Sequence, residues 1–198
     1  QMALLRHTTR LALRTPRRQL AAVPQTVPDD EFNKIKDELT AFMHDRIYPN
    51  EQLFLKQSHE SRGKGGREWT HPSLIVDLMQ EAKQRGLWNL FLPADSAQLA
   101  PANATHLGRG LTNLQYADLC ELMGTSVHFE FAATACNCAS PDTGNMETIA
   151  RFGTEEQKER WLAPLLDGSI RSCFAMTEPD VASSDATNIS IDIKDDGE

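Results

Sequence analysis

The residues best suited to chemistry lie near the end of the chain, in the stretch 174–185. Thr177 places a hydroxyl where a short β-capable run ends, and Glu178-Pro179 turns the backbone out of that run. Ser183 and Ser184 follow small side chains and offer hydroxyl and backbone N–H groups. Such a turn lets a phosphate approach the backbone closely, as in an anion-binding nest. On this pattern alone, an ordinary serine-rich turn is the commoner explanation.

Metal binding and acid–base catalysis find little support elsewhere in the sequence. None of the four cysteines forms a Cys-x-x-Cys pair, and Cys136 and Cys138 lack the second ligand pair of a zinc site. We therefore expect no metal, and reduced, mostly buried thiols in an intracellular protein. Among the acids, Glu130 and Glu147 are lone carboxylates in helical segments, which usually face solvent. We assign no catalytic residue to this chain.

The charge of the chain is divided unevenly. Residues 1–28 hold five arginines and no acid, whereas the remainder holds all 28 Asp and Glu against 15 of the 20 Lys and Arg. So acidic a body argues against nucleic acid as the main partner, because phosphate binding needs a basic face. No apolar run approaches the ~18 residues of a membrane-spanning helix, so we expect no membrane span.

Residues 1–28 form a basic arm. Arg6, Arg10 and Arg14 recur every four residues, with Leu4 before them and Leu11 between the last two, so a helix here would have one basic and one apolar side. An arginine-rich segment without acids is typical of a mitochondrial transit peptide. A secretory signal fits less well, because no uninterrupted apolar core follows the first charge. We expect mitochondrial import; the alternative is a solvated basic tail on a peroxisomal or cytoplasmic protein.

Residues 29–168 are predicted to form a helical domain. Apolar residues recur at spacings of three and four, and cap or stop residues bound the segments. The pairs at 112–115 and 154–157 have the spacing of capping boxes. Leu114 and Trp161 are expected to face the core. The predicted helices cover residues 29–47 (with Pro49 kinking or ending the helix), 72–85, 112–123, 127–138, 145–152 and 154–167.

The connections between the helices and the end of the chain lack the helical spacing of apolar residues. Segment 86–93 is predicted to be a buried, extended linker and 94–110 a loop. Residues 171–177 are β-capable, and residues 187–193 alternate strictly between isoleucine and polar side chains before a turn signal. The sequence therefore predicts a mainly α fold, in which the helical domain is followed by the beginning of a β domain at 169–198. Because the second strand of the hairpin is missing, the chain is expected to be truncated.

The stretch Phe-Ala-Met-Thr-Glu-Pro-Asp-Val-Ala-Ser-Ser-Asp at 174–185 resembles the first flavin-binding signature of acyl-CoA dehydrogenases. The preceding segment 153–168 is similar to the helix that leads into that signature in the family. The resemblance covers residues 29–198 and implies the N-terminal helical domain of that fold. The segments that look closest to the branch of family members ten and eleven are 86–93, 140–146 and 180–184.

The resemblance implies FAD as the cofactor. Phe174 and Met176 would lie along the flavin, and Thr177 would hydrogen-bond the ring near the atom that receives hydride. Ser183 and Ser184 would meet the pyrophosphate, and Ser184 would also contact the substrate. Ser183 stands where most members of the family carry glycine.

The reaction implied is α,β-dehydrogenation of an acyl-CoA thioester. Its partners would be the acyl-CoA, an electron-transferring flavoprotein and, in the complete protein, further copies in a homo-oligomer. Residues 134–146 would lie near the acyl pocket. In the family the catalytic base is a glutamate of a later helical domain, so we expect the 198-residue chain alone to be inactive and to bind FAD weakly. The alternative is a non-catalytic helical interaction module derived from the same fold.

Overall fold

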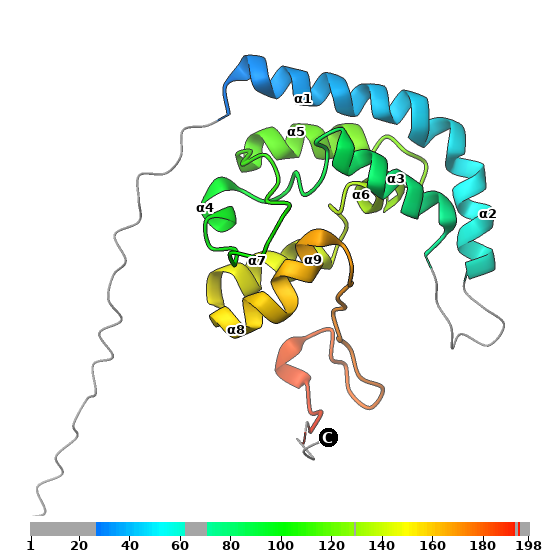
Figure 1. Ribbon diagram of the computed structural model, residues 1–198. Helices are drawn as coiled ribbons and strands as arrows, with labels where there is room; N and C mark the ends of the chain where they lie inside the picture. Colours follow the sequence, from blue (N-terminus) through cyan, green and yellow to red (C-terminus); the bar gives the residue numbers. More distant parts are fainter. Residues whose placement is uncertain (1–26, 62–70, 129, 193, 195–198) are drawn as a thin grey trace, which may run out of the picture.

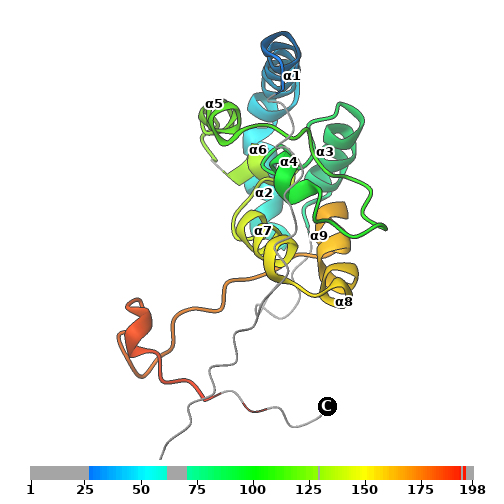
Figure 2. The same ribbon diagram turned by 90° about the vertical axis from the view of Figure 1, so that its left-hand side faces the viewer.

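The computed structural model describes residues 27–61, 71–128, 130–192 and 194, and these residues contain no β-strand. Helices pack around one core, and the chain after α9 runs away from them (Figures 1 and 2). The helices are α1 (Asp29–Phe42), α2 (Glu51–Ser61), α3 (Ser73–Gln84), α4 (Ala94–Ala97), α5 (Asn113–Met123), α6 (Glu130–Ala135), α7 (Asp142–Phe152), α8 (Glu155–Gln157) and α9 (Ala163–Asp167).

Pro49 bends the first helical segment without ending helical structure. After α1, the backbone forms a π-helical turn over Met43–Ile47 and a 3₁₀ turn over Tyr48–Asn50, and α2 then begins. Pro49 lies in the first turn of the 3₁₀ segment, where a missing N–H costs little. In Figure 1, α2 turns away from the axis of α1. The predicted helix over 29–47 is confirmed, and of the two effects considered for Pro49 the kink is observed.

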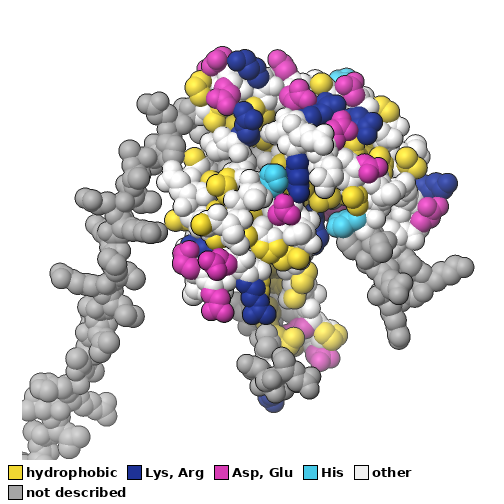
Figure 3. All heavy atoms as spheres, viewed as in Figure 1, with side chains coloured by type: hydrophobic (Ala, Val, Ile, Leu, Met, Phe, Trp, Pro, Cys, Tyr) yellow, Lys and Arg dark blue, Asp and Glu magenta, His cyan; other side chains and the backbone are white. Residues whose placement is uncertain are grey.

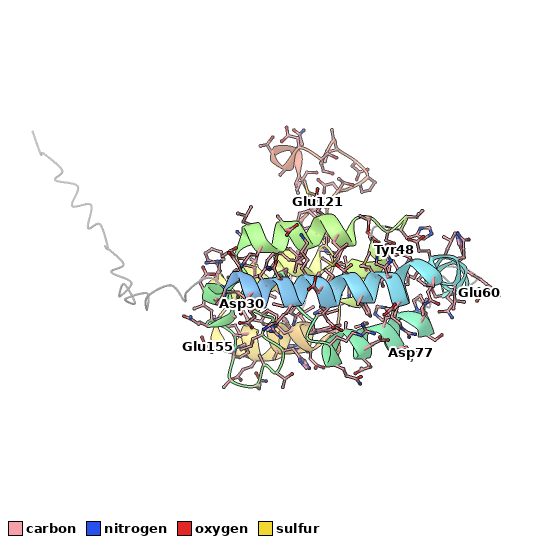
Figure 4. All side chains as sticks on the ribbon, turned by 90° about the horizontal axis from the view of Figure 1, so that it is seen from above. Asp30, Tyr48, Glu60, Asp77, Glu121 and Glu155 are labelled. Atoms are coloured by element: carbon pink, nitrogen blue, oxygen red, sulfur yellow. The ribbon has the colours of Figure 1, made fainter. Side chains whose placement is uncertain are left out.

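α5 lies beside α1 and runs in the same direction (Figure 4). At the start of both helices, Gln115 Nε2 donates a hydrogen bond of 2.8 Å to the Val27 carbonyl. At the far end, the Tyr48 and Thr125 hydroxyls are 2.6 Å apart. Residue numbers therefore rise together along the two helices, which leaves a groove between their outer sides.

α3 runs antiparallel to α1. Arg85, just after α3, pairs with Glu38 at 3.3 Å, whereas Glu81, one turn earlier, pairs with Arg46 at 2.8 Å. All four side chains are partly exposed, so each pair contributes only about 0–1 kcal/mol. The apolar core between the helices is therefore the main source of stability, and the ion pairs favour one orientation.

α6 lies at the centre of this core. Its side chains Phe131, Ala132 and Ala135 have no exposed surface. The alanines let α3 approach closely, and the Phe131 ring stacks on Phe54 of α2 with centroids 4.3 Å apart. The small-residue run that predicted an internal helix at 127–138 does form one, although a shorter one.

Segment 86–93 is buried as predicted, but it is turned rather than extended. Leu87, Leu90 and Leu92 are at most 1% exposed. Asn89 has a φ of 55°, in the left-handed region that asparagine tolerates better than most residues. That conformation reverses the chain within the core, so the prediction of an extended linker was wrong. Within 94–110, predicted as a loop, residues 94–97 form the short helix α4.

Two buried asparagines join this turned segment to α6 and α9. Asn137 Nδ2 donates to Asn89 Oδ1 at 2.7 Å and to the Leu165 carbonyl at 3.0 Å. Asn89 Nδ2 donates to the carbonyls of Leu166 at 2.8 Å and His106 at 2.7 Å. The last carbonyls of a helix have no partner within the helix. The asparagine amides therefore satisfy the buried end of α9.

Both predicted capping boxes are present. The Thr112 and Thr154 hydroxyls each accept a hydrogen bond from the backbone of the glutamine three residues later, and each glutamine side chain reciprocates. From Thr154 the helix continues through α8, a π-helical turn over Lys158–Leu162 and α9. Gly168, at a φ of 77°, ends it, and a Cβ there would lie 2.6 Å from the Trp88 ring. Only glycine fits both demands.

Two residues predicted to face the core are exposed. Leu114 is 82% exposed, and Trp161 is 37% exposed with the Arg160 guanidinium 4.7 Å from its ring centre. In both helices, residues further along take the buried positions: Leu119 in α5 and Leu166 in α9. The apolar stripe of a short helix is wider than the face that it buries, so periodicity alone misassigns its edges.

The predicted strands are not observed. Residues 171–177 form neither helix nor strand, and Ala186–Asn188 form a 3₁₀ turn inside the segment predicted as the second strand. Ile189 and Ile191 are 44% and 62% exposed. A strand needs a partner for its backbone groups, and none lies beside these segments in the described residues. Position 193 and the turn signal at 195–197 lie outside the described part.

Replacing Asn137 with alanine should lower the free energy of unfolding by about 2–4 kcal/mol. The change leaves two buried acceptors unpaired, at about 1–3 kcal/mol each, and puts alanine in a left-handed conformation. Urea denaturation measures the difference. Asn33→Ala, on the exposed side of α1, is the matched control and should change stability by less than about 0.5 kcal/mol. Equal effects of the two substitutions would contradict the role given to the pair.

Candidate functional site

A buried carboxylate holds the chain where it leaves the helical body. The Asp142 side chain, at the start of α7, is 2% exposed and pairs with Arg171 at 2.6 Å. Its Oδ1 accepts hydrogen bonds from the backbone N–H and the hydroxyl of Ser172, at 2.8 and 2.6 Å. Asn145, one turn further, donates to the Ser172 hydroxyl and to the Cys173 carbonyl. These contacts set the starting point of the stretch 174–185.

Beyond Cys173, the stretch lies outside the helical core, and both views show it apart from the helices (Figures 1 and 2). Phe174 is 69% exposed, Met176 is partly buried, and Thr177 and Ser184 are exposed. Within the described residues, neither Thr177 nor Ser184 donates a hydrogen bond from its backbone N–H or its hydroxyl. Both therefore offer free donors to a ligand.

Ser183 is placed differently from its neighbour. It is 2% exposed, and its hydroxyl accepts a hydrogen bond of 2.7 Å from the Glu178 backbone N–H. The Glu178 carboxylate in turn accepts from the Ser190 backbone N–H. In this structure the Ser183 hydroxyl thus closes the loop on itself. A hydroxyl that accepts one hydrogen bond can still donate another, so this contact leaves the predicted phosphate contacts of both Ser183 and Ser184 open.

The loop is shaped further by two residues that the sequence reasoning did not select. Asp185 caps the 3₁₀ turn by accepting from the backbone N–H and the hydroxyl of Thr187, and these hydrogen bonds lower the pKa of its carboxyl. Asn188 Nδ2 donates to the Ala182 carbonyl at 3.2 Å. The signal was available, because an Asp side chain in a loop often accepts a hydrogen bond from the backbone N–H two residues later.

A cavity of about 500 Å³ opens between α2, α3 and α6, close to Arg171. Thr134, Ala139 and Ser140 line it, so part of the segment 134–146 that was expected near an acyl pocket does border a cavity. His71 lines it as well, and burial together with the Arg171 charge lowers the pKa of its imidazole. None of the five predicted flavin-contacting residues reaches this cavity.

Among the described residues, the thiols and charges give no sign of a metal centre. Cys136 and Cys138 are buried, Cys120 is partly buried and Cys173 is exposed, and all four are free. Burial raises the pKa of Cys138 to about 12, so its thiol stays protonated. In the part of the chain that the structure describes, no group of three or more His, Cys, Asp or Glu could hold a metal ion. No helix found there is long and apolar enough to cross a membrane.

On the face shown in Figure 3, Lys and Arg side chains are interspersed with Asp and Glu over α1 and its neighbours. No continuous basic surface, of the kind that binds a nucleic-acid backbone, lies on that face. The two lone carboxylates, Glu130 and Glu147, have surroundings that do not suggest a catalytic base. Glu147 pairs with Arg151 at 2.9 Å, and Glu130 is exposed at the rim of the 500 Å³ cavity.

Known proteins share both the sequence and the helical architecture. The family model of the acyl-CoA dehydrogenase N-terminal domain matches residues 29–169. Acyl-CoA dehydrogenase family member 10 of Mus musculus is 49% identical over 162 residues, which are 82% of this chain and 14% of that protein. Acyl-CoA dehydrogenase family member 11 of Gallus gallus is 45% identical over 156 residues, 79% of this chain and 18% of that protein.

A solved structure agrees with these relatives. A putative acyl-CoA dehydrogenase from Mycobacterium abscessus superposes with a TM-score of 0.65 at 42% identity, over 81% of this chain and 37% of that chain. The chain thus spans well under half the length of each of these proteins. The resemblance to the branch of members ten and eleven is confirmed, and the chain belongs to the acyl-CoA dehydrogenase family, with its N-terminal domain at residues 29–169.

Proposed function

We propose that this chain forms the N-terminal part of an FAD-dependent enzyme that dehydrogenates acyl-CoA thioesters between their α and β carbons. The observation that carries the proposal is the stretch 174–185, where Thr177 and Ser184 present unused donors and the Phe174 ring is exposed. An aromatic face and free donors suit a flavin and a pyrophosphate, respectively.

Each residue would have a separate part in binding. Thr177 would donate a hydrogen bond to the flavin ring, with Phe174 and Met176 packing along it. The N–H and hydroxyl of Ser184 would hold the pyrophosphate and touch the acyl-CoA. Ser183 would support them by keeping the loop closed on Glu178. The anchor at Asp142 would hold this edge of the site at a constant place beside the helical domain.

FAD, when bound, would supply the hydride acceptor, which no side chain can provide. The substrate would lose its α-hydrogen as a proton and its β-hydrogen as a hydride, leaving a carbon–carbon double bond. The helical domain would contribute alignment: apolar groups of the 500 Å³ cavity, such as Phe54 and Ile75, suit part of an acyl chain. The base would come from a part of the complete protein beyond this chain. Electron-transferring flavoprotein would reoxidise the flavin, and the complete enzyme would be a homo-oligomer.

In the complete protein, an acyl-CoA should bleach the absorbance of bound FAD under anaerobic conditions, and electron-transferring flavoprotein should restore it. Thr177→Ala and Ser184→Ala should each weaken FAD binding roughly three- to tenfold, because each removes one hydrogen bond of about 0.5–1.5 kcal/mol. Thr148→Ala, at an exposed position on α7, is the control and should leave FAD affinity unchanged. A protein with stoichiometric FAD that is inert to acyl-CoAs of every length would overturn the enzyme proposal and favour the non-catalytic module.

We also propose that residues 1–28 direct mitochondrial import. A fluorescent reporter fused to them should enter mitochondria, since the segment carries five arginines and no acid. Changing Arg6, Arg10 and Arg14 to glutamate should keep the reporter in the cytosol, whereas changing the same three to lysine preserves the charge and should preserve import. Fluorescence microscopy gives the answer, and a cytosolic or peroxisomal reporter with the unchanged arm would contradict the proposal.

A further inference from the structure

Glu178 is partly buried within a stretch that is otherwise mostly exposed. Thr177 before it and Pro179 and Asp180 after it are all exposed. Glutamate side chains usually extend into solvent, so partial burial in a surface loop needs a local cause. The cause is a set of hydrogen bonds that joins Glu178 to two later segments of the same loop.

The backbone of Glu178 binds the first of these segments. Its N–H donates to the Ser183 hydroxyl at 2.7 Å, which closes a turn over residues 178–183. Thr177 and Ser184 lie immediately outside the two ends of this turn, so its closure brings their backbones close together. Both have donors that are unused within the described residues. The turn therefore gathers the donors that the proposed cofactor would need.

The side chain of Glu178 binds the second segment. Its Oε1 accepts a hydrogen bond from the Ser190 backbone N–H, 12 residues later, and lies 3.4 Å from the Ser190 hydroxyl. Asn188 joins the same two parts of the loop, since its Nδ2 donates to the Ala182 carbonyl at 3.2 Å. The carboxylate thus holds the returning segment against the turn that contains Ser183.

We propose that Glu178 is a positioning residue for FAD, whose carboxylate fixes the loop so that Thr177 and Ser184 present their donors together. The inference rests on the function proposed above and gives a part in it to a residue that touches neither cofactor nor substrate. Donors on an unsupported loop must be ordered when the ligand binds, which lowers affinity. A loop that is already held by the Ser190 contact avoids that cost.

The negative charge of Glu178 makes this role testable by the sign of the effect. A carboxylate near a pyrophosphate repels it, so removal of the charge alone should strengthen FAD binding. Removal of the acceptor should instead weaken FAD binding, because the Ser190 segment is then no longer held. Glutamine keeps an acceptor oxygen without the charge, whereas alanine removes both.

Calorimetric titration of FAD into the complete apoprotein tests the proposal. Glu178→Ala should raise the Kd for FAD about threefold or more, whereas Glu178→Gln should leave it within about twofold of the unchanged protein or lower it. Asp180→Ala is the matched control, since it removes an exposed acid of the same loop whose side chain makes no hydrogen bond or ion pair among the described residues. It should not raise the Kd. At saturating FAD, the visible circular dichroism of the bound flavin should change in Glu178→Ala and not in Asp180→Ala.

Hydrogen exchange gives a readout that needs no FAD. In the 198-residue chain, the Ser190 backbone N–H should exchange about fivefold faster or more in Glu178→Ala than in the unchanged chain or in Asp180→Ala, as measured by NMR. Equal exchange rates, an unchanged or lower Kd in Glu178→Ala, or equal losses of affinity in Glu178→Ala and Glu178→Gln would each overturn the inference. A complete protein that binds no FAD even when unchanged would overturn the proposed function, and the inference with it.

Discussion

The pairing of two buried amides, Asn89 and Asn137, is the contact on which the rest of this structure depends. Both residues are at most 1% exposed and adopt left-handed backbone conformations. Between them they satisfy the carbonyls at the end of α9 and join the turned segment 86–93 to the end of α6. Trp88 adds a third donor, since its Nε1 donates to the Leu166 carbonyl at 2.7 Å. Buried polar groups are costly unless paired, so this arrangement admits few alternatives.

The position of the candidate site follows from that pairing. Because the end of α9 is held, Gly168 can reverse the chain only where its missing Cβ leaves room for the Trp88 ring. The next residues reach Asp142, whose buried carboxylate holds Arg171 and Ser172. The stretch 174–185 therefore starts from a rigid support, although it lies outside the core itself. Such an arrangement suits the edge of the flavin site that we propose for this stretch.

Local signals in the sequence predicted several helix ends, although α2 and α4 were not predicted. The capping boxes at Thr112 and Thr154 and the stop at Gly168 depend only on residues a few positions apart, and all three are where the sequence places them. Relations across the chain were not predictable in the same way. No residue near Asn89 in the sequence indicates that its side-chain amide pairs with that of Asn137, 48 residues later. Similarly, the residues around Ser183 do not indicate whether its hydroxyl closes the loop or contacts a phosphate. The prediction of strands was wrong for a related reason. Alternating isoleucines indicate which face of a strand would be apolar, but they do not supply the partner strand that a sheet needs.

We propose that this chain holds one edge of a flavin site and needs the rest of the enzyme to bind FAD. Thr177 and Ser184 can supply about two hydrogen bonds of ~0.5–1.5 kcal/mol each, against an association cost of at least ~4 kcal/mol. Calorimetric titration of FAD into the isolated chain measures the balance directly. We expect a dissociation constant at or above about 1 mM. A micromolar constant that is lost on Thr177→Ala would contradict it, because the edge would then be a binding site by itself.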